Sequence, residues 1–152
     1  MLTQDEFEQL INDPTKTIQE DIIWEDDEDH SPAVEFQVEV TSEEGYPLFI
    51  KGSYNQLTRK LSYAIVHRSV GRIYALDLGA DHRNPDREEI TGGLHKHRWD
   101  VLYKDKKAYI PRDITASVDE PVEVWRQFCA ESRITHNGSI NEPPPTQLDL
   151  FL

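Results

Sequence analysis

The chain has 152 residues and a formal net charge of -13, and hydrophobic residues make up 37% of it. This length predicts one domain with a single core, and no apolar run approaches the roughly 20 residues that a membrane span requires. The acidic N-terminus is unlike a secretory signal, and the single cysteine, Cys129, excludes an internal disulfide. We therefore expect a cytoplasmic protein without membrane contact, in which Cys129 is a buried and inert thiol.

The N-terminal segment predicts a helix and then a strand. Thr3 and Glu6 form a capping box ahead of apolar residues at helical spacing, so a short amphipathic helix is expected from about residue 4 to residue 12. Residues 17–24 have the alternation that is typical of a strand. The acidic run over residues 25–29 is expected to be a solvated loop.

The next segment predicts four further strands. Residues 33–40 give the clearest one, because valine and phenylalanine alternate there with glutamate and glutamine. Strands are also expected at 46–51, 61–68 and 72–78, and residues 52–55 are expected to break the pattern after the first of these. Short connections between successive strands predict an antiparallel meander.

The C-terminal part predicts a last hairpin over residues 98–103 and 108–111, and then an amphipathic helix that begins at residues 119–121. The expected fold is therefore α+β: a mainly antiparallel sheet of six or seven strands, a short N-terminal helix and one C-terminal amphipathic helix. We expect this single domain to span residues 1–135. A proline-rich linker should follow over residues 136–146.

A long loop between two predicted strands holds most of the chemically unusual side chains. Asp77, just before the loop, shares strand parity with Ile73 and Ala75, so it is expected to face the interior and to need a partner. Arg83, a histidine or Arg98 could supply that partner. Long loops in compact domains are usually functional or disordered. The candidate catalytic residues combine imidazole, carboxylate and guanidinium groups: His82, His95, His97, Asp77, Asp81, Arg83 and Arg98.

Metal binding is one interpretation of this loop. His95 and His97 form an H-x-H pair, which on a strand would project both imidazoles from the same face as potential ligands. Asp81, His82 or Asp77 could complete the ligand set. However, Lys96 and Arg98 adjoin the histidines, and their charges disfavour a nearby cation. We therefore expect no metal and no other cofactor.

Two other interpretations of the loop need no metal. Imidazoles could carry protons while Arg83, Arg98 or Lys96 steadies a phosphate, which describes a small nuclease or phosphotransfer enzyme. Alternatively, the histidines and arginines serve only to hold a long loop against the sheet by hydrogen bonds. The sequence leaves both alternatives open.

The charges are unevenly distributed along the chain. Residues 1–50 hold 15 acids and one base, whereas residues 51–113 hold 13 bases and 8 acids. Bases alternate with aromatic residues in the middle segment, which could favour single-stranded nucleic acid. Strand parity directs several of these aromatics inward, and the acidic segment repels phosphates, so we expect weak nucleic-acid binding or none. An acidic inhibitor or antitoxin that imitates the charge of nucleic acid is a further alternative.

The chain ends in the sequence QLDLFL. Its first five residues match the bacterial sliding-clamp-binding motif at every position, and the peptide resembles the Q-L-[SD]-L-F segments of polymerases, repair proteins and other clamp clients. This resemblance implies a partner rather than an activity. In that family the glutamine hydrogen-bonds in one subsite and the apolar side chains fill a pocket. The partner-binding residues expected here are Gln147, Leu148, Leu150, Phe151 and Leu152.

The resemblance makes the leading expectation an accessory protein of bacterial or phage DNA metabolism that docks on the replication sliding clamp. The rest of the chain is similar only to uncharacterised bacterial or phage proteins, which implies no function. The alternative for the tail is a final edge strand, in which Leu148, Leu150 and Leu152 pack on the protein's own sheet.

Overall fold

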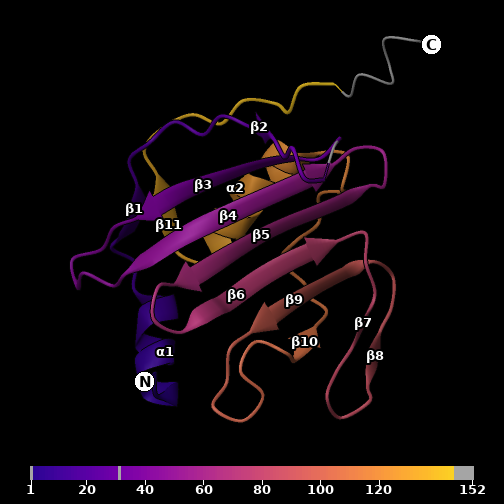
Figure 1. Ribbon diagram of the computed structural model, residues 1–152. Coiled ribbons are helices and arrows are strands. Elements are labelled where there is room, and N and C mark those ends of the chain that lie inside the picture. Colours follow the sequence, from indigo (N-terminus) through magenta and orange to yellow (C-terminus); the bar gives the residue numbers. More distant parts are fainter. Residues whose placement is uncertain (1, 31, 146–152) are drawn as a thin grey trace.

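The computed structural model describes residues 2–30 and 32–145. Its main sheet contains seven strands, which are β2 (Glu25–Asp26), β3 (Val34–Val40), β4 (Leu48–Asn55), β5 (Lys60–His67), β6 (Gly71–Leu78), β9 (Leu94–Arg98) and β10 (Ala108–Tyr109). They are antiparallel throughout, in the order β10-β9-β6-β5-β4-β3-β2 (Figure 1). This confirms the predicted α+β fold and its meander.

Two helices and two small strand pairs complete the described structure. The helices are α1 (Gln4–Asn12) and α2 (Pro121–Glu131). A parallel pair joins β1 (Lys16–Ile18) to β11 (Ile134–His136), and β7 (His82–Arg83) pairs with β8 (Glu89–Ile90) in a hairpin. In Figure 1, α2 lies behind β3, β4 and β5, while the front of these strands is uncovered. Neither helix has the length and apolar character needed to cross a membrane.

Local sequence signals account for α1. Thr3 caps the helix, because its Oγ1 accepts a hydrogen bond of 3.1 Å from the backbone nitrogen of Glu6. Phe7, Leu10 and Ile11 form its buried side. The helix therefore begins and ends where the sequence predicted.

Lys16 closes the other end of α1. Its ammonium group is buried and donates hydrogen bonds of 2.8 Å to the carbonyls of Leu10, Ile11 and Asp13. These carbonyls are the groups that a helix end leaves without partners, and a cation there also interacts favourably with the helix dipole. Burial lowers the pKa of Lys16 to about 8.

The core lies between α2 and the sheet. Trp125 of α2 makes edge-on aromatic contacts with Phe36 and Tyr63, with ring centroids 5.5 Å and 5.1 Å away. The hydroxyl of Tyr63 donates a 2.6 Å hydrogen bond to the carbonyl of Pro121, which fixes the start of the helix on the sheet. Cys129 is buried here, and burial raises the pKa of its thiol to about 12.

The predicted break at residues 52–55 is wrong, because β4 continues through them. Gly52 lies opposite Phe36 in the register, and a Cβ atom added to Gly52 would lie 2.1 Å from the Phe36 ring. The glycine is therefore required for close packing of the ring against the strand, and does not mark a turn.

Two other predicted strands differ from the structure. Only the start of the range 17–24 is a strand, because the continuous pairing of β1 with β11 ends at Ile18 and His136. The expected hairpin strand over residues 98–103 is instead β9, which ends at Arg98. The expected acidic loop is partly β2, whose residues are exposed at the edge of the sheet, where acidic side chains remain solvated.

The domain extends past the predicted boundary at residue 135. The backbone nitrogen of Asn137 donates to the Ile18 carbonyl at 2.8 Å, and that of Ile22 donates to the Ser139 carbonyl at 2.7 Å. The indole of Trp24 donates to the Asn141 carbonyl at 3.1 Å. Residues of the expected linker are thus bound to the domain as far as Asn141. The tail peptide, residues 147–152, lies outside the described residues.

Candidate functional site

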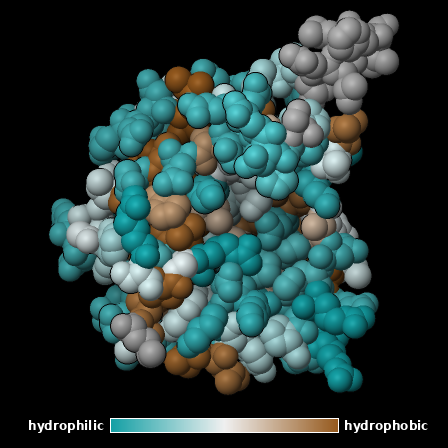
Figure 2. Space-filling view, in the orientation of Figure 1, coloured by the Kyte–Doolittle hydropathy of each residue, from teal (hydrophilic) through white to brown (hydrophobic). Residues whose placement is uncertain are grey.

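The uncovered face of the sheet carries a row of polar side chains. Glu35 pairs with Ser53, Ser53 with Ser62, Ser62 with Asp77, and Asp77 with His95. Directly paired residues point to the same face of a sheet, so this row crosses five strands from β3 to β9. Hydrophilic side chains predominate over the centre of this face in Figure 2.

Asp77 binds two histidines at the β9 end of this row. Its Oδ2 atom lies 3.2 Å from Nε2 of His95 and 3.4 Å from Nε2 of His97. Burial would raise the pKa of Asp77, but hydrogen bonds with His95, His97 and Ser62 hold it well below its usual value. The carboxylate is therefore ionised, and it fixes the orientation of both rings.

The predicted type of partner for Asp77 is confirmed, but the face of the sheet on which Asp77 lies is not the predicted one. A histidine partner was among those expected, and the structure supplies two. The side chain of Asp77 is 19% exposed and so is largely buried, as expected. However, it lies on the face opposite α2, because the adjacent residues Leu76 and Leu78 belong to the core side of β6, where Tyr74 contacts Phe128 of α2.

His82 joins these two histidines from the β7–β8 hairpin. Its ring centroid lies 5.3 Å from that of His95 and 4.6 Å from that of His97. Its Nε2 atom lies 2.7 Å from the carbonyl of Lys106, and Nδ1 of His97 lies 2.6 Å from the carbonyl of Asp105. One ring nitrogen of each histidine lies within 4.8 Å of the other two.

Asn84 holds the hairpin in place. This residue is 2% exposed, its Nδ2 atom donates to the Ala108 carbonyl at 2.8 Å, and its Oδ1 atom accepts from the Ala108 nitrogen at 2.6 Å. The amide thus satisfies both backbone groups of a residue in edge strand β10. Sequence reasoning missed this role, because Asn84-Pro85 resembles an ordinary turn.

The side chains of two predicted basic residues, Lys96 and Arg98, point away from the histidines. Lys96 is 1% exposed, and its ammonium group lies 2.6 Å from a carboxylate oxygen of Glu131 on α2. Arg98 forms an ion pair with Glu8 of α1. Both residues alternate with His95 and His97 along β9, so their side chains leave the opposite face.

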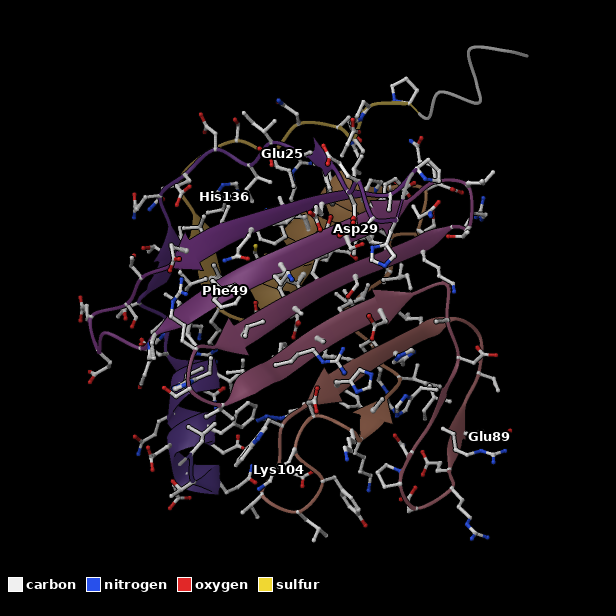
Figure 3. The ribbon with its side chains drawn as sticks, in the orientation of Figure 1. Glu25, Asp29, Phe49, Glu89, Lys104 and His136 are labelled. Carbon is white, nitrogen blue, oxygen red and sulfur yellow. The ribbon has the colours of Figure 1, made fainter. Side chains whose placement is uncertain are left out.

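The other two predicted residues lie near His82 but do not contact the imidazoles of β9. Arg83 forms an exposed ion pair with Glu89, which is labelled on the hairpin in Figure 3. Asp81 accepts a hydrogen bond of 3.1 Å from the backbone nitrogen of Gly93. A cavity of about 240 Å³ lies here, lined by Asp81, His82, Arg83, Glu89, Ile90 and Thr91.

The sequence of residues 2–134 matches a family described as "Family of unknown function (DUF6978)". The chain belongs to this family. No curated protein and no solved structure matches it. The region shared with DUF6978 contains the seven-stranded sheet, α2 and the three histidines, whereas the clamp-like tail follows it.

The site of this DUF6978 member can support proton transfer. The carboxylate of Asp77 accepts from Nε2 of His95, which leaves Nδ1 of the same ring as a lone pair that can accept a proton. His95 and His97 are each 3% exposed, so water has little access to this pair. The structure thus brings together His82, His95, His97 and Asp77. It leaves Arg98 and Lys96 outside the site.

Proposed function

We propose that this protein is a cytoplasmic accessory factor of bacterial or phage DNA metabolism, which docks on the replication sliding clamp through residues 147–152. The observation that carries the proposal is the match of five consecutive residues, QLDLF, to the clamp-binding motif. Gln147 would occupy the polar subsite, and Leu148, Leu150 and Phe151 the apolar pocket. The family match ends at residue 134, so the peptide lies outside the matched residues.

The architecture of the domain supports docking through an appended peptide. Asn141 makes the last backbone hydrogen bond to the domain among the described residues, and residues 142–145 are without regular structure there. Figure 1 shows this yellow segment along the upper edge of the molecule, beyond the sheet. Three consecutive prolines, 143–145, favour an extended spacer of about 3.1 Å per residue, which would present the peptide away from the domain.

Calorimetric titration with a purified bacterial clamp tests the proposal. The full chain should bind with micromolar affinity, and a chain that ends at Glu142 should not bind. Asp149→Ser is the matched control within the tail, because the motif accepts aspartate or serine at this position. Equal binding by the full and shortened chains, or no binding by either, would contradict the proposal.

A second candidate function is hydrolysis of a phosphate ester at the histidines. It is favoured by the convergence of three imidazoles with the carboxylate of Asp77, which a small nuclease or phosphotransfer enzyme of the kind expected from the sequence would require. The basic groups of Lys96 and Arg98 are paired on the other face, so they would not hold the phosphate.

Release of nitrophenol from a chromogenic phosphodiester tests this second function. His95→Gln should abolish turnover, because it removes the ring nitrogen that accepts the proton. His67→Ala should not change turnover, because His67 lies at the opposite end of β5 from Ser62, which neighbours Asp77. Turnover that is equal in the two variants would rule out the histidines as the catalytic groups.

A further inference from the structure

In two of the three histidines, one ring nitrogen is hydrogen-bonded to a backbone carbonyl. Nε2 of His82 lies 2.7 Å from the Lys106 carbonyl, and Nδ1 of His97 lies 2.6 Å from the Asp105 carbonyl. A carbonyl oxygen can only accept, so each of these nitrogens carries a proton and donates it. The second nitrogen, Nδ1 of His82 or Nε2 of His97, carries a lone pair when its ring is neutral, and in His97 this requires release of the contact with Oδ2 of Asp77 at 3.4 Å.

His95 has the same arrangement, with a carboxylate in place of the carbonyl. Its Nε2 atom donates to Asp77 at 3.2 Å. Its Nδ1 atom is buried and has no hydrogen-bond partner, although the residue is 3% exposed. A buried nitrogen without a partner costs free energy unless a ligand satisfies it.

We propose that His82, His95 and His97 bind one divalent transition-metal ion, with zinc as the best match, through one nitrogen of each ring. One nitrogen of each ring lies within 4.8 Å of the other two. Zinc–nitrogen bonds of about 2.0–2.1 Å in tetrahedral geometry place ligand nitrogens about 3.3 Å apart, so the rings must close by roughly 1 to 1.5 Å. His82 can make this movement, because it is half-buried and lies in a two-residue strand of a hairpin.

The surroundings of the three rings are those that metal-binding histidines require. Each ring donates its remaining N–H to a fixed acceptor, and this sets its tautomer and increases the basicity of the nitrogen that faces the ion. Asp77 adds a negative charge beside the site. The expectation of no metal rested on Lys96 and Arg98, and these side chains face away and are neutralised by Glu131 and Glu8.

Three protein ligands leave one tetrahedral position for water or a substrate atom. This is the pattern of catalytic rather than structural zinc sites, and zinc so bound lowers the pKa of its water to about 7. The cavity of about 240 Å³ that His82 helps to line would give small molecules access to that position. The inference is independent of clamp docking, and metal binding can be measured without any enzymatic activity.

Calorimetric titration of the tag-free full chain with Zn²⁺, after treatment with a chelator, tests this site. One equivalent should bind, and Co²⁺ should give the intense visible absorption of a tetrahedral complex. His82→Ala should weaken Zn²⁺ binding by at least 100-fold, and Asp77→Asn by roughly 10- to 100-fold through the orientation of His95. His67→Ala should bind as the unaltered chain does, because it lies roughly 16 Å along β5 from the site.

Melting curves without metal show whether each variant folds, and His82→Ala is the least demanding change because it alters a half-buried hairpin residue. If His82→Ala and the unaltered chain bind Zn²⁺ with the same affinity, the proposal is wrong. It is also wrong if Co²⁺ gives only the weak absorption of an octahedral ion. The Co²⁺ spectrum of the unaltered chain decides the question even if variants at His95 or His97 do not fold.

Discussion

Oδ2 of Asp77 lies 3.2 Å from Nε2 of His95, and the two residues are direct neighbours across the pairing of β6 and β9. Adjacent strands hold both partners, so the pair is built into the sheet and does not depend on the long loop between them. The same carboxylate also lies 3.4 Å from His97, which follows His95 on the same face. One buried acid thus organises two imidazoles.

Removal of that acid should destabilise the metal-free protein. Asp77→Ala leaves ring N–H groups of His95 and His97 without their acceptor in a buried place, and an unsatisfied buried donor costs about 1 to 3 kcal/mol. Urea denaturation should show a loss of this size in the free energy of unfolding. Ser53→Ala, at an exposed position in the same row, should change stability by less than about 0.5 kcal/mol. Equal stability of the two variants would contradict the structural role of Asp77.

Gly52→Ala should destabilise the core through one steric contact. The new methyl group would lie 2.1 Å from the ring of Phe36, and overpacking of this kind costs about 1 to 3 kcal/mol. A Phe36→Leu change should reduce the cost of Gly52→Ala in a double-mutant cycle, because it removes the ring that clashes. Additive effects of the two changes would show that the ring is not what excludes a side chain at this position.

Lys16 should make stability depend on pH in the alkaline range. Burial lowers its pKa to about 8 in the folded protein, whereas a lysine in the unfolded chain titrates near 10.5. Between these values the unfolded state binds more protons, so the contribution of Lys16 to the free energy of unfolding rises with pH. The stability difference between the unaltered chain and Lys16→Met should therefore shift in favour of the unaltered chain from pH 7.5 to 10.

Urea denaturation of both proteins at several pH values measures this difference, and subtraction cancels the titration of groups that they share. A difference that does not change with pH would show that the ammonium of Lys16 is not held in the buried cap of α1. A difference that shifts in favour of Lys16→Met as pH rises would contradict the direction of the pKa change.

Local rules predicted the parts of this fold that depend on neighbouring residues. The capping box gave α1 its correct start, and strict alternation identified β3. The break predicted at residues 52–55 was wrong, because a glycine that marks a turn and a glycine that accommodates a ring look the same in a sequence. The extension of the domain to Asn141 depends on hydrogen bonds to residues near the N-terminus, which no local pattern records.

The candidate site was also predicted only in part from the sequence. The H-x-H spacing correctly placed His95 and His97 on one face, and a histidine was among the expected partners of Asp77, but parity wrongly directed this carboxylate toward the core. The same parity rule places Lys96 and Arg98 on the opposite face, so their positions next to the histidines in the sequence do not bring their charges next to the imidazoles. The contribution of Asn84 could not be predicted, because it acts on edge strand β10 through tertiary contacts.

A few side chains of the tail should carry most of its affinity for the clamp. Leu150→Ala and Phe151→Ala should each cost about 2 to 4 kcal/mol, because these residues would bury the largest apolar surfaces. Gln147→Ala should cost roughly 1 to 3 kcal/mol, since it would leave a polar group of the pocket without a partner. Asp149→Ser should have almost no effect. Competition titrations with variant peptides give these values, and equal losses at all four positions would contradict binding in the manner of the motif.

The most direct test of clamp docking is fluorescence anisotropy of a labelled decapeptide, Pro143 to Leu152, titrated with clamps from several bacteria. We predict saturable binding with micromolar affinity, on the order of -7 to -9 kcal/mol, because a flexible peptide loses conformational freedom on docking. The full chain and a version that ends at Glu142 should also melt at the same temperature. If the peptide shows no saturable binding and the shortened chain melts markedly lower, the tail is an edge strand of its own domain and the clamp proposal is wrong.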